Sequence, residues 1–126
     1  MIEAEPPPRI LIVEDSIFVV MMLEAMCEDL GWTVVGPATR IDEAVRLATA
    51  EAIDAAILDV NLNDEFSWPV AAALQARGVP FAFGTGYDVA GIVPPAFASV
   101  AVFAKPYRVG EVERQLRALL GATSAA

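Results

Sequence analysis

The sequence contains no histidine, and its 126 residues include a single cysteine. Without histidine the chain cannot build a Ser-His-Asp or Cys-His nucleophile pair, a His-ligated metal site or a phosphohistidine of its own. The lone Cys27 cannot form an internal disulfide, which fits a reducing compartment. Any chemistry on this chain must therefore rely on carboxylates.

Basic residues are also scarce, with 8 Lys and Arg against 17 Asp and Glu and a net charge of −9. A strongly acidic surface is repelled by phosphate backbones and by anionic lipids, so we expect neither nucleic-acid nor membrane binding. The chain is 56% hydrophobic, which excludes a disordered chain and favours one compact domain.

Long apolar segments are missing as well. The longest unbroken apolar run, Ile17 to Leu23, is far shorter than the roughly 20 residues of a membrane-spanning helix. The first eight residues are acidic and proline-rich, unlike a signal peptide. We therefore expect a cytoplasmic protein with a flexible tail at residues 1–8, one domain at residues 9–121 and a second flexible tail at residues 122–126.

Short strand-like runs alternate with longer helical ones along the rest of the chain. The predicted strands are Arg9–Val13, Thr33–Val35, Ala55–Asp59, Phe81–Phe83 and Val100–Ala104. The predicted helices run from Asp15 or Ser16 to about Leu30 before Gly31, from Thr39 to about Ala52, from Pro69 to Gly78, and from Val109 to Leu120 before Gly121. The last helix has one apolar stripe, formed by Val109, Val112, Leu116, Leu119 and Leu120.

Strands that alternate with helices predict a doubly wound α/β fold, a five-stranded parallel sheet with helices on both faces. The segment from Gly84 to Ser99 carries two glycines and a Pro-Pro pair, so the fourth helix should be short or irregular. In such folds the functional site lies at the carboxyl ends of the strands.

Polar side chains stand where the predicted strands end. These residues are Glu14 and Asp15 after the first strand, Asp59 after the third, Thr85 after the fourth, and Lys105, the only lysine, after the fifth. Crowded carboxylates either raise a pKa or hold a hard cation, for which Mg²⁺ is the natural candidate. A carboxylate cluster with one lysine and one hydroxyl suits phosphoryl chemistry, which depends on charge stabilisation.

In order and spacing, four segments of the chain resemble the receiver domain of bacterial response regulators, a flavodoxin-like (CheY-like) fold. They are Ile12-Val13-Glu14-Asp15-Ser16, Ile57-Leu58-Asp59-Val60-Asn61-Leu62, Gly84-Thr85-Gly86-Tyr87 and Phe103-Ala104-Lys105-Pro106-Tyr107. The resemblance implies that Asp59 accepts a phosphoryl group from a phosphohistidine on a histidine kinase or phosphotransfer protein.

The same resemblance assigns roles to the remaining residues. Mg²⁺ would be held by Glu14, Asp15, Asp59 and the backbone carbonyl of Asn61. Lys105 would pair with the phosphoryl oxygens, and its peptide bond to Pro106 would be cis. Thr85 would bond a phosphoryl oxygen only after phosphorylation, which would be the switch.

Two departures narrow the resemblance. Val102 stands where most receivers carry a switch aromatic, three residues before the lysine. The run Phe83-Gly84-Thr85-Gly86-Tyr87-Asp88 is similar to the signature of the alphaproteobacterial FAT GUY subfamily, although Gly84 and Asp88 differ from it and leave the role of Tyr87 open. That subfamily implies a stress-response phosphorelay.

The apolar run at Ile17–Leu23 would pass right around a helix, so part of it should be exposed. In receivers this helix docks onto the donor's four-helix bundle, and we expect some of Ile17, Val20 and Met21 to contribute to that surface. Since no output domain follows Gly121, we expect a stand-alone receiver that signals by binding a downstream protein or by passing the phosphoryl group on.

Two alternatives remain open on the sequence. The first is a pseudo-receiver that binds partners without phosphorylation. The second is a haloacid-dehalogenase-like phosphatase, which also uses a strand-end aspartate followed by a threonine and a lysine, but the chain is short for that fold and lacks a cap. A nucleotide-binding domain is disfavoured because the first strand is not followed by a Gly-rich phosphate loop.

Overall fold

The computed structural model of the chain describes residues 6–86 and 91–124. Its centre is a five-stranded sheet in the order β2-β1-β3-β6-β7, in which every neighbouring pair is parallel. The strands are β1 (Arg9–Val13), β2 (Thr33–Ala38), β3 (Ala55–Asp59), β6 (Phe81–Thr85) and β7 (Val102–Ala104). The predicted fold class is confirmed.

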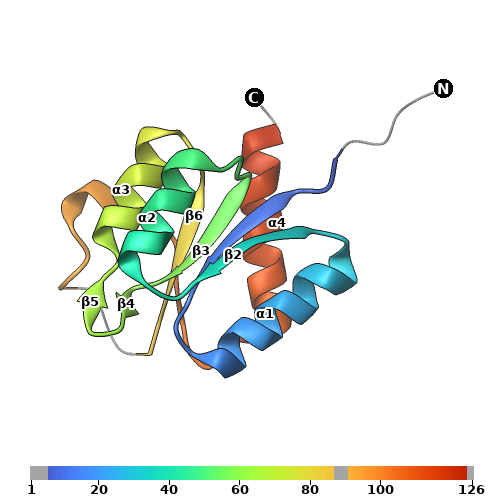
Figure 1. The fold of residues 1–126 in the computed structure, drawn as a ribbon, viewed down its shortest axis with the longest axis horizontal. Helices are drawn as coiled ribbons and strands as arrows, with labels where there is room; N and C mark the ends of the chain where they lie inside the picture. Colours follow the sequence, from blue (N-terminus) through green and yellow to red (C-terminus); the bar gives the residue numbers. More distant parts are fainter. Residues whose placement is uncertain (1–5, 87–90, 125–126) are drawn as a thin grey trace.

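Four helices cover the two faces of the sheet. They are α1 (Ile17–Leu30), α2 (Ile41–Ala50), α3 (Trp68–Ala76) and α4 (Val109–Ser124). Figure 1 shows α2 and α3 together on one side of the strands and α1 and α4 on the other. A sheet enclosed in this way needs strands that are apolar on both faces, which is why β3 and β6 are buried along their whole length.

Alternate residues of β1 belong to different halves of the core. Leu11 and Val13 pack into the cluster that faces α2 and α3, whereas Ile10 and Ile12 join the cluster that faces α1 and α4. This follows from the two-residue period of a strand, which points successive side chains to opposite faces. All four side chains are buried to at least 99%, so β1 fixes the position of the residues that follow it.

The connection from β6 to β7 contains no full-length helix among its described residues. A single turn of 3-10 helix, η1 (Pro95–Phe97), follows Pro94, as the Pro-Pro pair predicts. Phe97 from this turn is buried against Phe83 of β6 at a centroid separation of 6.0 Å. This short turn therefore covers the core at a place where the sequence predicts no full-length helix.

Several predicted boundaries were wrong. Among the strands, β2 continues beyond the predicted Val35 to Ala38, β6 continues beyond Phe83 to Thr85, and β7 begins at Val102 instead of Val100. Among the helices, α2 spans Ile41–Ala50 and α3 ends at Ala76, so both are shorter than predicted. The helix α4 runs through Gly121 to Ser124, so residues 122–124, counted above with the tail, are helical. Exposed helix ends carry little packing, so local sequence defines them poorly.

The N-terminus of α2 and the first residue of α4 also differ from prediction. Arg40 rather than Thr39 is the N-cap of α2, although the Glu43 carboxylate accepts a hydrogen bond from the Thr39 N–H at 3.2 Å. Val109, predicted on the apolar stripe of α4, is 44% exposed, whereas Val112 and Leu116 are buried.

The loop from residue 60 to residue 68 contains a small hairpin that the sequence interpretation missed. Its strands are β4 (Asn61–Leu62) and β5 (Glu65–Phe66), which pair antiparallel (Figure 1). Leu62 is fully buried in the core, and the Phe66 ring stacks on Trp68 at 5.4 Å. The hairpin is thus attached to the domain at both of its strands.

The apolar surface of α1 includes two of the three residues from which the prediction drew. Ile17 and Met21 are exposed to 62% and 59%, and Phe18 is exposed to 81%, but Val20 is only 4% exposed. Val20 points into the core because it is three residues before Leu23 and lies on the same side of the helix. Tyr87, another predicted functional residue, lies outside the described residues.

Within residues 6–86 and 91–124, no helix combines the length and apolar character needed to cross a bilayer. Cys27 is completely buried in α1. Burial, together with the nearby charge of Glu24, raises the pKa of its thiol to about 11. The side chain therefore packs as a small hydrophobe.

Gly84 leaves space for a neighbouring aromatic side chain. A β-carbon at this position would collide with the hydroxyl and ring of Tyr107, which is itself buried. We expect Gly84→Ala to lower the free energy of unfolding by about 1–3 kcal/mol, because it overpacks this contact. Urea denaturation followed by circular dichroism measures the change.

Gly86→Ala is the matched control, since among residues 6–86 and 91–124, chain neighbours aside, nothing lies within 4 Å of a β-carbon at Gly86. Its unfolding free energy should stay within about 0.5 kcal/mol of the unaltered protein. Equal stability of the two variants would contradict the packing of Tyr107 against Gly84.

Candidate functional site

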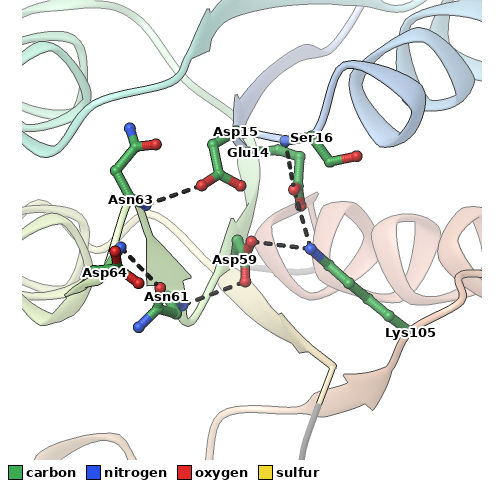
Figure 2. Close-up of polar contacts among 8 residues, drawn as sticks. All are labelled: Glu14, Asp15, Ser16, Asp59, Asn61, Asn63, Asp64 and Lys105. Carbon is green, nitrogen blue, oxygen red and sulfur yellow. Dashed lines mark hydrogen bonds and ion pairs between the residues drawn. The ribbon is translucent and has the colours of Figure 1, made fainter.

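The predicted site residues gather at the carboxyl edge of the sheet. Glu14 and Asp15 follow β1, Asp59 is the last residue of β3, and Lys105 follows β7 directly. Figure 2 shows Asp59 between Lys105 on one side and Asn61 on the other. Because β1, β3, β6 and β7 are parallel, their ends meet at one edge, as the strand pattern predicts.

Lys105 binds two carboxylates at once. Its Nζ atom donates to Asp59 Oδ2 at 2.9 Å and to Glu14 Oε1 at 3.0 Å. The side chains of Glu14 and Asp59 are 1% and 8% exposed, and that of Lys105 is 21% exposed. The ammonium therefore neutralises acidic groups that water reaches poorly.

The pKa values of both partners reflect this enclosure. Burial, and next the negative charge of Asp59, raise the pKa of Glu14 to about 6, although Lys105 and the Ser16 N–H act against the shift. Burial lowers the pKa of Lys105, but its hydrogen bonds to Asp59 and Glu14 outweigh burial and raise that pKa above its usual value. Lys105 stays charged near neutral pH.

Backbone N–H groups also donate to the three carboxylates of the cluster. The Asn61 N–H donates to Asp59 Oδ1 at 3.3 Å, and the Ser16 N–H donates to Glu14 Oε1 at 3.0 Å. Asp15, which is exposed, accepts a hydrogen bond from the Asn63 N–H at 2.9 Å. Each carboxylate thus has a defined orientation before any ligand arrives.

Thr85 lies at the same edge, two strands away from Glu14. It is 4% exposed, and its backbone carbonyl accepts a hydrogen bond from the Lys105 N–H at 2.7 Å. The register of β6 and β7 pairs Thr85 with Ala104. The hydroxyl-bearing residue and the lysine are therefore tied to each other through the backbone, and the Lys105–Pro106 peptide is cis, as expected.

Comparison with known proteins identifies the family to which this fold belongs. The solution structure of SdrG from Sphingomonas melonis Fr1 is 42% identical, covers 93% of this chain and 99% of its own, and has a TM-score of 0.79. A second SdrG structure, in a BeF₃-activated conformation, is 42% identical and has a TM-score of 0.71 over 89% of this chain and 95% of its own.

A receiver domain from the sensor histidine kinase PA1611 of Pseudomonas aeruginosa PAO1 is also similar. It is 27% identical, covers 91% of this chain and 98% of its own, has a TM-score of 0.77, and holds a magnesium ion in its active-site cleft. The chain belongs to the receiver-domain family of response regulators. A receiver is a signalling module, and receivers work with histidine kinases.

Curated relatives extend the same family. The Phyllosphere-induced regulator PhyR of Methylorubrum extorquens is 36% identical over 116 residues, which are 86% of this chain and 42% of PhyR. The transcriptional regulatory protein PdtaR of Mycobacterium tuberculosis is 27% identical over 87% of this chain and 55% of its own length. The receiver thus spans about half the length of these relatives. No protein-family profile matches the chain.

The acidic cluster of this receiver fits a divalent metal ion. One oxygen from each of Glu14, Asp15 and Asp59 lies within 4.8 Å of the others. Glu14 Oε2 is buried and has no hydrogen-bond partner in the described part of the chain. A buried carboxylate oxygen without a partner is costly, and a set of hard oxygen ligands suits Mg²⁺.

Two features of the site were missed in the sequence. Tyr107 was recognised as part of a motif but was given no role, yet its ring lies 5.7 Å from Lys105 Nζ and packs edge-on against Phe103 at 5.0 Å. Burial, with the charges of Glu14 and Asp59, raises the pKa of its hydroxyl. Asn63 falls in the loop predicted after the third strand, although two adjacent residues that tolerate positive φ, Asn63 and Asp64, are compatible with a tight turn.

Removing the charge of Lys105 should destabilise the fold. We expect Lys105→Met to lower the free energy of unfolding by about 2–4 kcal/mol in metal-free buffer, because it leaves Glu14 and Asp59 close together without a counter-ion. Urea denaturation at neutral pH measures this loss.

Arg117→Met is the matched control. Arg117 forms an ion pair with Glu113 on the same helix, at 2.9 Å, but its side chain is 57% exposed. An exposed pair contributes little, so the control should lose less than about 0.5 kcal/mol. If both variants lost the same small amount, the enclosed ion pairs of Lys105 would not stabilise the fold.

Proposed function

We propose that this receiver accepts a phosphoryl group on Asp59 and that Glu14, Asp15 and the Asn61 carbonyl hold the required Mg²⁺ together with Asp59. The observation that carries this proposal is the contact of the Asp59 carboxylate with Lys105 on one oxygen and with the Asn61 N–H on the other. The magnesium ion in the PA1611 receiver and the BeF₃-activated form of SdrG support it.

Asp59 acts as the nucleophile in this proposal. One of its oxygens forms a bond to phosphorus while the bond between phosphorus and the donor's imidazole nitrogen breaks, and the electron pair stays on that nitrogen. Because Asp59 is 6% exposed, an incoming phosphoryl group must enter along the edge where Asp15 and Lys105 lie (Figure 2).

Bound Mg²⁺ supplies charge neutralisation for the phosphoryl oxygens. The chain prepares for it by fixing the ligands, since Glu14 follows directly on the buried strand β1 and Asn61 begins the hairpin strand β4. Lys105 then exchanges its bond with Asp59 for a bond with a phosphoryl oxygen. That exchange moves the ammonium charge from the Asp59 carboxylate to the phosphoryl oxygens, where the negative charge then lies.

Thr85 is the proposed reporter of phosphorylation. Its hydroxyl donates to a phosphoryl oxygen after transfer, which displaces the end of β6. Val102 replaces the usual switch aromatic and is 42% exposed, so a rotating ring at this position is absent. The displacement must therefore be transmitted by other residues that touch the end of β6.

The exposed apolar patch of α1 is the proposed docking surface for the donor. We define it as Ile17, Phe18 and Met21, the exposed apolar residues near the start of the helix. α1 starts three residues after Glu14, so a helical bundle that covers the patch also approaches the acidic site. We infer a histidine kinase or phosphotransfer protein as that partner, in a stress-response phosphorelay like that implied by the FAT GUY resemblance.

We propose two routes for the step that follows phosphorylation. With residues 9–121 as the receiver unit, the phosphorylated form binds a target protein or passes its phosphoryl group on. A net charge of −9 disfavours nucleic acid as that target.

Phosphorylation at Asp59 is directly testable. Incubation with a small-molecule phosphodonor and Mg²⁺ should add one phosphoryl group to the protein, and Asp59→Asn should abolish the addition because an amide is a poor nucleophile. Intact-mass spectrometry measures it. Asp54→Asn is the control, since Asp54 accepts a hydrogen bond from the Arg9 N–H at the opposite end of β3.

Three outcomes separate the open alternatives. Labelling of Asp59→Asn to the level of the unaltered protein would rule out Asp59 as acceptor. No labelling of the unaltered protein would favour a pseudo-receiver, and sustained release of inorganic phosphate from phosphate esters would favour the phosphatase alternative.

The docking surface has its own test. Phe18→Ser should slow transfer from a phosphorylated donor protein at least tenfold, because it removes an exposed apolar contact, while the rate with a small-molecule donor stays unchanged. Stopped-flow or gel-based transfer assays measure both rates. Val109→Ser, at an exposed apolar residue of α4, is the control, and equal transfer rates for the two variants would refute docking through α1.

A further inference from the structure

Asn63 connects three loops at the carboxyl edge of the sheet. Its backbone N–H donates to Asp15 Oδ2 at 2.9 Å, and its side-chain Nδ2 donates to the Thr39 carbonyl oxygen at 2.7 Å. Figure 2 shows the first of these bonds reaching from the hairpin to Asp15. Asn63, which lies in the loop after β3, thereby contacts the loops that follow β1 and β2.

The turn that carries Asn63 has a fixed backbone. Asn63 and Asp64 have φ values of 51° and 65°, and they link β4 to β5, where Leu62 pairs with Glu65. A two-residue hairpin with positive φ at both positions matches the right-handed twist of its strands, and Asn and Asp tolerate this conformation well. The Asp64 N–H also donates to Asn61 Oδ1 at 3.1 Å.

Asp15 needs such support more than its neighbours do. Glu14 and Asp59 are buried and bound by Lys105, whereas Asp15 is exposed and repelled by both carboxylates. The bond from Asn63 occupies one of its oxygens and leaves the other available to a metal ion. Orienting the carboxylate in advance reduces the ordering cost of metal binding.

We propose that Asn63 is a positioning residue for the metal site: its backbone N–H orients Asp15, and its side-chain amide anchors the hairpin to Thr39 so that this bond persists. The proposal rests on the proposed function, in which Asp15 is a Mg²⁺ ligand. Groups that orient metal ligands commonly affect affinity even though they do not touch the ion.

Asn63→Gly separates the anchor from the turn. Glycine keeps the positive φ and the backbone donor but removes the bond to Thr39. We expect it to weaken Mg²⁺ binding about three- to tenfold, as measured by calorimetric titration of the full chain. The thermal midpoint of the metal-free protein should change little, because the removed hydrogen bond is exposed.

Asp64→Gly is the matched control, since it introduces glycine at the other positive-φ residue of the same turn and leaves the bonds of Asn63 in place. It should bind Mg²⁺ within twofold of the unaltered protein at physiological ionic strength, where the lost exposed charge is screened. An equal loss of affinity in both variants would mean that loosening of the turn, rather than the anchor, explains the effect, and would overturn the proposal.

Hydrogen exchange supplies a second measurement that does not depend on the folding of Asn63→Gly. In the metal-free protein the Asn63 amide should exchange at least tenfold more slowly than in Asp15→Ala, because the carboxylate accepts its hydrogen bond. Equal exchange in the two proteins would overturn the proposal.

The calorimetric result also separates this proposal from the function on which it rests. If the unaltered protein bound no Mg²⁺, both would fail. If the unaltered protein and Asn63→Gly bound Mg²⁺ equally well, only the role of Asn63 would fail.

Discussion

The paired contact of Lys105 with Glu14 and Asp59 is the interaction on which the rest of the structure depends. Two acidic side chains that are almost completely buried sit at the ends of adjacent strands, β1 and β3. Without a nearby positive charge, their repulsion and lost hydration would oppose the packing of those strands. The ammonium comes from the far edge of the sheet, so it joins β7 to the centre.

The position of Lys105 follows from backbone geometry. Its N–H donates to the Thr85 carbonyl at 2.7 Å, and β6 and β7 are paired up to Thr85 and Ala104. The lysine therefore starts where the ladder ends and reaches across β6 toward β3. The Tyr107 ring, which fits against Gly84, lies beside its ammonium group. Thr85, the proposed reporter of phosphorylation, and Lys105 thus lie at the same edge of the sheet.

Sequence reasoning recovered the parts of the molecule that are encoded locally. Apolar runs that end in a polar residue located the carboxyl edge, because β1 and β3 are buried on both faces and the carboxylates of Glu14 and Asp59 come where those runs end. The Pro-Pro pair correctly predicted the short turn before β7. The final turns of α2, α3 and α4 were placed less well, since exposed helix ends are determined by few contacts.

Features that depend on tertiary packing were not accessible in the same way. Whether Val20 or Phe18 faces the core depends on how α1 lies on the sheet, and an all-apolar run gives no indication of it. The hairpin at Asn63 and Asp64 carries a turn signal, but its importance lies in bonds to Asp15 and Thr39, which are distant in sequence. The need for glycine at position 84 is explained only by the packing of Tyr107 against it.

The most direct test of this account is the structure of the protein with Mg²⁺ and beryllofluoride, an analogue of the phosphoryl group. The account predicts that beryllium is bonded to Asp59, that Lys105 Nζ has left Asp59 Oδ2 for a fluorine atom, and that the Thr85 hydroxyl contacts the same group. A structure in which Lys105 keeps both carboxylate contacts, or in which beryllofluoride is bound away from Asp59, would contradict it.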